Sequence, residues 1–272
     1  MGLQINNNVA AFNAYRNLSH TQGALGKNLE KLSSGFRINR AADDAAGLAI
    51  SEGLRAQVGG LKQAARNAQD GVSVVQTAEG ALTEVHAMLQ RVRDLSVQAA
   101  NDSNSAESRE AIQAEITQLG EALGDIQDRT EFNGTKLLDG SATQMGFQVG
   151  SNAGDTLNVN MVDLTSVVTA VKAIDVTSAA GATAAISVVS AEITTVSAGR
   201  ANLGASQNRL EHTINSLNVS IENLTASESR IRDTDMAAEM TSFSKNQILS
   251  QAGTAMLAQA NQAPQGVLRL LG

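Results

Sequence analysis

The chain has 272 residues, a formal net charge of −7 and no cysteine. An acidic chain is not expected to bind nucleic-acid phosphates, and a chain without thiols holds neither disulfide bonds nor cysteine metal sites. Trp is absent, and the aromatic residues are five Phe and one Tyr, so the 42% apolar fraction is mainly aliphatic. This composition is typical of long packed helices rather than of an enzyme pocket.

The first predicted element is an amphipathic helix near the N-terminus. Its apolar residues recur at helical spacings and are Leu18, Leu25, Leu29, Leu32 and Phe36. No basic segment followed by an apolar one precedes it, so we expect no cleaved signal peptide. No stretch approaches the roughly eighteen apolar residues of a membrane span, so we expect no membrane partner.

A much longer helix is predicted next, between residues 50 and 99. Its small and apolar residues alternate at spacings of three and four, which is the pattern of a coiled-coil seam. A third helix follows the polar run from Asn101 to Ser105, and the short connection predicts that it returns antiparallel to the second. The seam of this third helix is Ile112, Ile116, Leu119, Leu123 and Ile126.

The sequence pattern then changes to one typical of a small β-hairpin region. Asn133-Gly134 and Asp139-Gly140 are turn signals, and residues 147–149 and 157–161 alternate as strands do around a Gly-containing loop. Residues 165–185, which are rich in Ala, Thr, Ser and Val, are ambiguous between strand and linker.

The strongest seam lies between residues 186 and 231. Eleven of its fourteen positions are Ile, Val or Leu, and the full set is Ile186, Val189, Ile193, Val196, Arg200, Leu203, Gln207, Leu210, Ile214, Leu217, Ile221, Leu224, Glu228 and Ile231. Three helices with such seams can bury one another's apolar residues, so we expect them to form the core.

The C-terminal segment again looks helical, and the residues that mark it are Met236, Met240, Phe243, Gln247, Ile248, Met256 and Leu257. Two amphipathic segments at opposite ends of the chain are expected to pair. A two-helix pair is marginally stable and leaves apolar surface exposed, so we expect the ends to associate with copies of the same chain.

Several blocks resemble bacterial flagellin, in the order that the family has them. Residues 32–39 read Leu-Ser-Ser-Gly-Phe-Arg-Ile-Asn, residues 42–50 read Ala-Asp-Asp-Ala-Ala-Gly-Leu-Ala-Ile, and residues 229–235 read Ser-Arg-Ile-Arg-Asp-Thr-Asp. Further blocks include residues 65–71, 89–95 and 132–134. The resemblance spans roughly residues 1–160 and 185–272, and only about forty residues stand where longer flagellins insert variable domains.

The resemblance implies a mainly α fold, in which long antiparallel coiled-coil helices come from both chain ends and accompany a small β-hairpin region. Residues 1–42 and 234–272 would form an inner terminal domain, and residues 43–233 an outer helical domain that includes the hairpin region 131–177. The function implied is that of a structural subunit of the extracellular flagellar filament used for swimming. The alternative is a hook–filament junction protein, which shares the terminal helices.

The family also implies sites and partners. Filament assembly would use Leu25, Leu29, Leu32, Phe36, Met240, Phe243, Ile248, Leu257, Leu270 and Leu271. The partners would be further copies of the chain, an export chaperone, the filament cap, hook-junction proteins and a host Toll-like receptor. Export would follow the flagellar type III pathway.

The receptor would contact Arg91, Leu95, Gln98 and Glu115, and we expect Leu95 to lie beside the core rather than in it. The tail Val267–Leu271 resembles a leucine-rich segment that cytosolic NAIP-class receptors recognise.

No catalytic, cofactor or metal site is expected. His20, His86 and His212 are scattered, no His-Glu-x-x-His motif occurs, and Asp43-Asp44 is explained by the dipole of the helix that follows. We therefore expect a protein that is not an enzyme.

Overall fold

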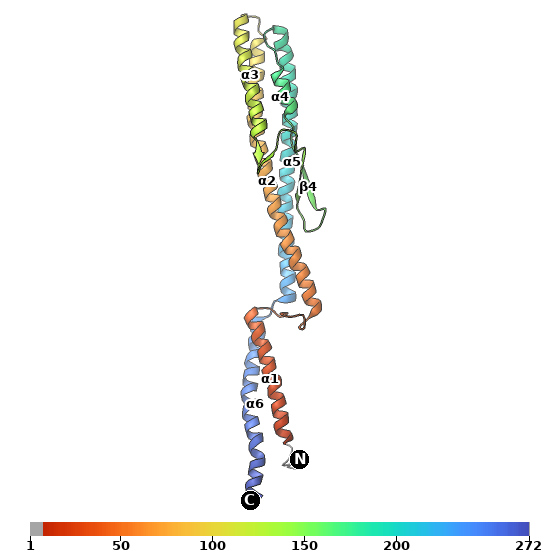
Figure 1. Cartoon of the computed structure of the whole chain (residues 1–272), viewed down its shortest axis with the longest axis vertical. Coiled ribbons are helices and arrows are strands. Elements are labelled where there is room, and N and C mark those ends of the chain that lie inside the picture. Colours follow the sequence, from red (N-terminus) through yellow and green to blue (C-terminus); the bar gives the residue numbers. More distant parts are fainter. Residues whose placement is uncertain (1–7, 272) are drawn as a thin grey trace. The chain divides into compact units, whose positions relative to one another are not determined.

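The structure is a computed structural model that describes the backbone of residues 8–271 and the side chains of residues 8–262. The elements in chain order are α1 Val9–Ser34, α2 Ala45–Ala99, α3 Ala106–Arg129, β1 Glu131–Phe132, β2 Thr135–Lys136, β3 Gln144–Gln148, β4 Thr156–Asn160, α4 Thr165–Lys172, α5 Ala179–Arg232 and α6 Met236–Leu271 (Figure 1). The chain divides into two compact units, one of residues 1–56 and 223–272 and the other of residues 57–222. The mainly helical fold expected from the sequence is confirmed.

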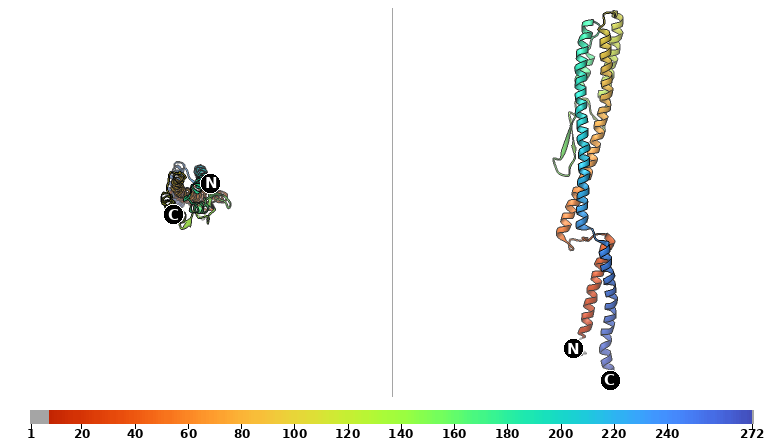
Figure 2. Two further views of the ribbon diagram at one scale, coloured as in Figure 1. Left: turned by 90° about the horizontal axis from the view of Figure 1, so that it is seen from above. Right: turned by 180° about the vertical axis from the view of Figure 1, so that it is seen from behind.

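The core of the second unit is built where α2, α3 and α5 lie alongside one another (Figures 1 and 2). Glu79 of α2 pairs with Arg200 of α5 at 3.7 Å, and Arg91 of α2 pairs with Glu115 of α3 at 2.7 Å. The residues that share the seam of α2 and are fully buried there include Val75, Ala78, Leu82, Val85, Leu89 and Val92. The predicted antiparallel seams are therefore packed against each other.

Small residues in α2 let neighbouring elements come close. A β-carbon at Gly71 would lie 3.2 Å from the ring of Phe147 in β3 and 3.3 Å from Leu210 in α5. Any side chain at this position would displace one of these two neighbours. The absence of a side chain at Gly71 thus lets both β3 and α5 pack closely against α2.

Two antiparallel hairpins follow α3, as the turn signals predict. In the first, Phe132 pairs with Thr135 across a two-residue loop in which Asn133 has φ 49° and Gly134 has φ 78°. Positive φ at both positions matches the twist of the flanking strands. In the second, β3 pairs with β4 from Gln144↔Asn160 to Gln148↔Thr156.

The ambiguous segment 165–185 is neither strand nor linker but largely helix, since it contains α4 and the start of α5. Val167, Val168 and Val171 of α4 are buried. Val171 lies beside Gly120 of α3 and Val168 beside Gly124, where the missing side chains let the two helices approach closely. This packing outweighs the weak helix propensity of Val, which tertiary contacts often override.

By length and composition, α5 satisfies the criteria for a membrane-crossing helix, contrary to the expectation above. One 18-residue window has a mean hydropathy of 1.4, with 22% of its residues buried. The core helix of a water-soluble protein passes the same test. Because Val189, Val196 and Leu203 of α5 are fully buried in the core, we interpret α5 as a core helix.

In the first unit, α1 and α6 lie side by side (Figures 1 and 2). Their contact is narrow, and Leu18 and Asn28 are the buried residues of α1. The Asn28 side chain lies in a polar layer with Glu239 and Asn246; with its amide oriented to pair with both, its nitrogen donates to Glu239 Oε1 and its oxygen accepts from Asn246 Nδ2, each at 3.1 Å. A buried Asn in a helix pair stabilises one register at a cost in stability, because other registers leave its amide unpaired.

The packed seam of the second unit yields a stability prediction. Leu210→Ala removes a side chain that is fully buried, so it should lower the free energy of unfolding by about 2 to 5 kcal/mol. Val219→Ala, on the same helix but 58% exposed, should change it by no more than about 0.5 kcal/mol. Chemical denaturation followed by circular dichroism measures both, and equal effects would contradict the packing described.

The pairing of α1 with α6 can be tested by a disulfide, since the chain has no native cysteine. Leu18 Cβ lies 3.7 Å from the place of a β-carbon on Gly253, which is within the range for a disulfide. Leu18→Cys with Gly253→Cys should therefore cross-link under mild oxidation and migrate faster on a non-reducing gel. Phe12→Cys with Gly253→Cys is the control, because Phe12 is 70% exposed; cross-linking of the control alone would contradict the observed register.

Candidate functional site

The candidate functional surface is the outer face of the α1–α6 pair. Leu25, Leu32, Phe243 and Leu257 are half-buried in the first unit, whereas Leu29, Met240 and Ile248 are 55%, 51% and 65% exposed. The expected assembly residues therefore fall into a set near the helix contact and a set open to solvent. Leu270 and Leu271 lie in the last turn of α6, outside the described side chains.

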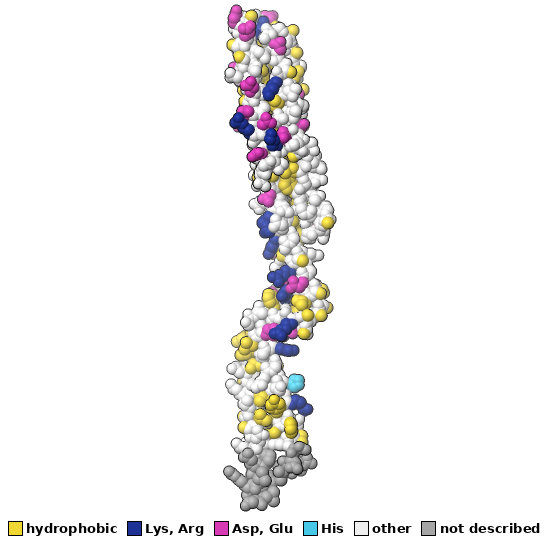
Figure 3. All heavy atoms as spheres, in the orientation of Figure 1, with side chains coloured by type: hydrophobic (Ala, Val, Ile, Leu, Met, Phe, Trp, Pro, Cys, Tyr) yellow, Lys and Arg dark blue, Asp and Glu magenta, His cyan; other side chains and the backbone are white. Residues whose placement is uncertain are grey.

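Further exposed apolar residues of this surface were not singled out in the sequence. Val9, Phe12 and Tyr15 of α1 are at least 61% exposed, and on α6 Leu249 is exposed as well. The spacing of three between the α1 residues was the signal that could have revealed them. Figure 3 shows hydrophobic side chains in several groups over the described part of this pair.

Phe36 lies in the connection between α1 and α2, where that connection pairs with the one between α5 and α6. It forms a β-bridge with Asp233, flanked by backbone hydrogen bonds from Arg37 N to Arg232 O at 2.7 Å and from Thr234 N to Gly35 O at 2.9 Å. The Arg232 guanidinium lies 4.7 Å from the Phe36 ring centroid, a cation–π distance. Phe36 is thus held by contacts of its own chain.

Polar groups support this junction on both sides. Arg232 donates to Glu52 Oε1 at 2.8 Å, and the Arg37 guanidinium donates to the Ile231 carbonyl at 2.7 Å. Asp43 accepts from the backbone N–H groups of Arg40 and Asn39, and these hydrogen bonds lower the pKa of its carboxyl. The loop between α1 and α2 is therefore tied to the end of α5 and to the connection between α5 and α6 by direct bonds.

Asp44 accepts from Gly47 N at 2.8 Å, immediately before α2 begins. This is the bond that a helix N-cap makes. It accounts for one carboxylate of the Asp43-Asp44 pair without a metal ion, and no group of three or more potential metal ligands occurs among the described residues.

The expected receptor patch on α2 and α3 is only partly on the surface. Arg91 donates two hydrogen bonds to Glu115 Oε1, at 2.9 and 2.7 Å, and Gln98 is exposed. Leu95, however, is only 2% exposed and belongs to the core, so the expectation that it lies beside the core is wrong. The buried stripe is wider here than the regular seam, since Leu95 and Ser96 are both buried.

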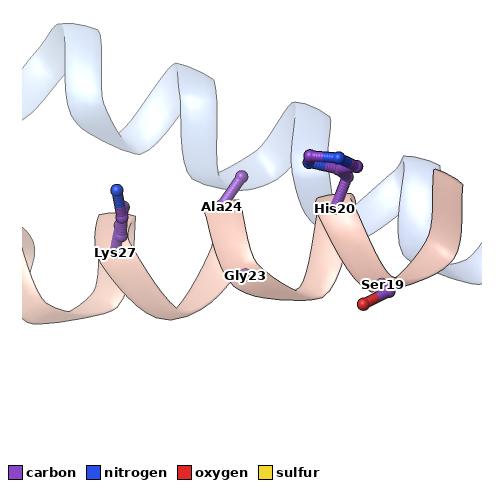
Figure 4. Close-up of a pocket in the computed structure, with 5 residues that line it drawn as sticks. All are labelled: Ser19, His20, Gly23, Ala24 and Lys27. Atoms are coloured by element: carbon purple, nitrogen blue, oxygen red, sulfur yellow. The ribbon is translucent and has the colours of Figure 1, made fainter. Parts of the chain in front are cut away.

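A concave place on α1 offers no catalytic arrangement. It is a shallow groove lined by Ser19, His20, Gly23, Ala24 and Lys27. Figure 4 shows His20, Ala24 and Lys27 on one side of the helix and Ser19 pointing away from them. His20 and Lys27 alone do not supply a nucleophile held by a base.

Comparison with known proteins identifies the family to which the sequence is similar. The N-terminal helical region of bacterial flagellin matches residues 5–143, and the C-terminal helical region of bacterial flagellin matches residues 186–271. The flagellin of Halalkalibacterium halodurans is 53% identical, over 98% of this chain and 99% of its own length. The flagellin of Bacillus subtilis is 52% identical, over 99% of this chain and 100% of its own.

A solved structure agrees with these matches. The crystal structure of Bacillus cereus flagellin is 32% identical, with a TM-score of 0.52 over 56% of this chain and 88% of that chain. The full-length matches are to flagellins and do not favour the hook–filament junction alternative. The chain therefore belongs to the bacterial flagellin family and is a structural subunit that polymerises into the extracellular flagellar filament.

Proposed function

We propose that the chain polymerises chiefly through the outer face of the α1–α6 pair, with residues 1–42 and 234–272 as the inner domain of the filament and residues 43–233 as the outer domain. The observation that supports this is the row of exposed apolar residues on both helices, among them Phe12, Tyr15, Ile248 and Met256, which are 63 to 70% exposed. Large apolar side chains exposed in such number on one helix pair indicate a protein contact. Neighbouring copies would cover it.

The contrast with the second unit supports the same assignment. There the apolar seams of α2, α3 and α5 are covered within the chain, with Leu82, Val85 and Leu89 fully buried. That unit needs no partner to fold. The terminal pair, which buries few side chains, gains most from assembly because association adds the contacts that two helices cannot supply.

The same marginal stability suits the proposed route out of the cell. Export through the flagellar type III pathway, without a cleaved signal peptide, requires a chain that can be threaded unfolded. A helix pair with a narrow contact opens at low cost.

The exposed apolar faces of α1 and α6 are also where an export chaperone, the filament cap and hook-junction proteins would bind. By this proposal, these partners would compete with further copies of the chain for one surface.

Recognition by a host Toll-like receptor is a further proposal, and it concerns the face formed by α2 and α3. Arg91, Gln98 and Glu115 offer charged and amide groups at the surface. Leu95 would act indirectly, because its buried side chain holds α2 in place rather than meeting a partner. The proposed contact set is therefore smaller than the one expected from the sequence.

The assembly surface can be tested with two substitutions on α6. Ile248→Asp replaces a 65% exposed apolar side chain by a charge and should raise the critical concentration for seeded polymerisation about tenfold for each 1.4 kcal/mol lost. Gln251→Asp places the same charge at an exposed polar position three residues away and should have little effect. Electron microscopy and sedimentation measure both; equal polymerisation of the two variants would show that Ile248 is not part of the assembly surface.

Deletion of residues 236–272 should abolish polymer and leave the second unit folded.

The receptor proposal predicts different effects for the exposed contact residues and for the buried Leu95. Arg91→Ala combined with Gln98→Ala should weaken signalling in a cell reporter assay while stability changes little, because an exposed ion pair contributes about 0 to 1 kcal/mol. Leu95→Ala should instead lower the free energy of unfolding by about 2 to 5 kcal/mol. The control is Glu84→Ala, an exposed charge elsewhere on α2. A double variant that signals like wild type would exclude the patch.

A further inference from the structure

We propose that Asn133, at the turn of the β1–β2 hairpin, is a site of spontaneous deamidation. The backbone nitrogen of Gly134 attacks Cγ of the Asn133 side chain, the C–N bond to the side-chain nitrogen breaks, and ammonia leaves. The five-membered succinimide that results is opened by water at either carbonyl. One opening gives Asp, and the other gives isoaspartate, in which the main chain runs through the former side chain. Water is the sole co-reactant, and no oxidant or reductant is required.

The attack is sterically open at this position. Asn133 and Gly134 are both exposed, and a β-carbon added to Gly134 would meet no atom within 4 Å. Asn133 is also the only Asn in the chain that is followed by Gly, the residue that hinders the attacking nitrogen least. Neither the Asn133 amide nor the Gly134 N–H makes a hydrogen bond to any residue that the structure describes. The two reacting groups are therefore free to approach each other.

Three other Asn residues outside the helices are held by bonds that oppose this reaction. Asn101 Oδ1 accepts from Ser103 N at 3.2 Å, and Asn104 Nδ2 donates to Gln98 O at 2.6 Å. Asn160 Oδ1 accepts from Gln144 Nε2 at 3.0 Å across the second hairpin. Each of these amides must break a hydrogen bond before its carbon can meet a backbone nitrogen, and none precedes Gly.

The second turn of this region provides a contrast in the same chain. Asp139 precedes Gly140, and an aspartyl residue cyclises through its neutral carboxylic acid. The Ser141 hydroxyl and backbone N–H both donate to Asp139 Oδ1 and lower the pKa of its carboxyl, so it stays ionised. A β-carbon at Gly140 would lie 2.9 Å from Asp163, so this turn is also crowded. We therefore place the reactive position at Asn133 and not at Asp139.

The product would alter the hairpin. Isoaspartate adds one main-chain carbon to a loop that has two residues between Phe132 and Thr135, and this spacing sets the register of the pair. Phe132 packs against the core of the second unit, so a loosened turn reaches buried apolar residues. Either product also adds a negative charge to a strand end that already carries Glu131.

The test is peptide mapping by mass spectrometry of the full chain after incubation at neutral and mildly alkaline pH. We expect the peptide that contains Asn133 to gain the mass of an amide-to-acid change several-fold faster than every other Asn-containing peptide, and faster at the higher pH, because the attacking nitrogen must lose its proton. Isoaspartate in that peptide is scored with a protein isoaspartyl methyltransferase.

Two comparisons decide the outcome. A parallel sample in urea shows the reactivity of the same sequence without the turn, and Gly134→Ala, checked for folding by circular dichroism, is expected to slow the conversion several-fold. If Asn133 converts in urea but persists in the folded chain as long as the other Asn residues do, the hairpin protects it and the proposal is overturned. Conversion at another Asn before Asn133 would overturn it equally.

Discussion

The structure depends on how many helices are available to cover each apolar seam. In the second unit three long helices share one core, and Leu82, Val85 and Leu203 are fully buried. In the first unit only two helices meet, so one face of each stays open, as Phe12 and Ile248 show. Two helices do not enclose a core, so by the proposal above a third or fourth helix would come from another molecule. Polymerisation would then follow from this shortage of partners.

The exposed pair nevertheless has a specified geometry. Asn28 lies between Glu239 and Asn246, so a slip of α1 along α6 would leave polar groups unpaired in the contact. At the other end of the pair, Asn8 Nδ2 donates to the Ala260 carbonyl at 2.7 Å. The pair thus has weak apolar burial but defined register. By the export proposal, this combination would let the ends open for transport and still return to one arrangement when copies meet.

Much of this fold could be predicted from spacing alone, because a seam repeated over many turns leaves few other arrangements. The helices that contain Ile112 and Leu210, the antiparallel return after Asn101 and the turn at Asn133-Gly134 were predicted, and the structure has them. Helix α4 could not be predicted, since its Val residues favour strands locally and become helical through contact with Gly120 and Gly124 of α3.

The burial of Leu95 was missed for a related reason. A regular alternation of three and four assigns position 96 to the seam, but packing buries both Leu95 and Ser96, and the Ser96 hydroxyl donates to the Val92 carbonyl at 2.7 Å. The spacing of residues in one helix does not reveal how wide a stripe its neighbours cover. The exposed face of α1 was incompletely predicted because apolar residues at helical spacing look the same whether or not a partner is present within the chain.

Six of the seven buried residues of α5 recur every seven positions, at Ala182, Val189, Val196, Leu203, Leu210 and Leu217. A strict period of seven means that a shorter insertion in this helix rotates every later side chain away from its partners. A whole heptad would restore the phase of α5, but α2 runs antiparallel to it and would need the same length added opposite. Growth of the chain during evolution is therefore easier in the connections, such as the stretch between β4 and α5, than in the rods.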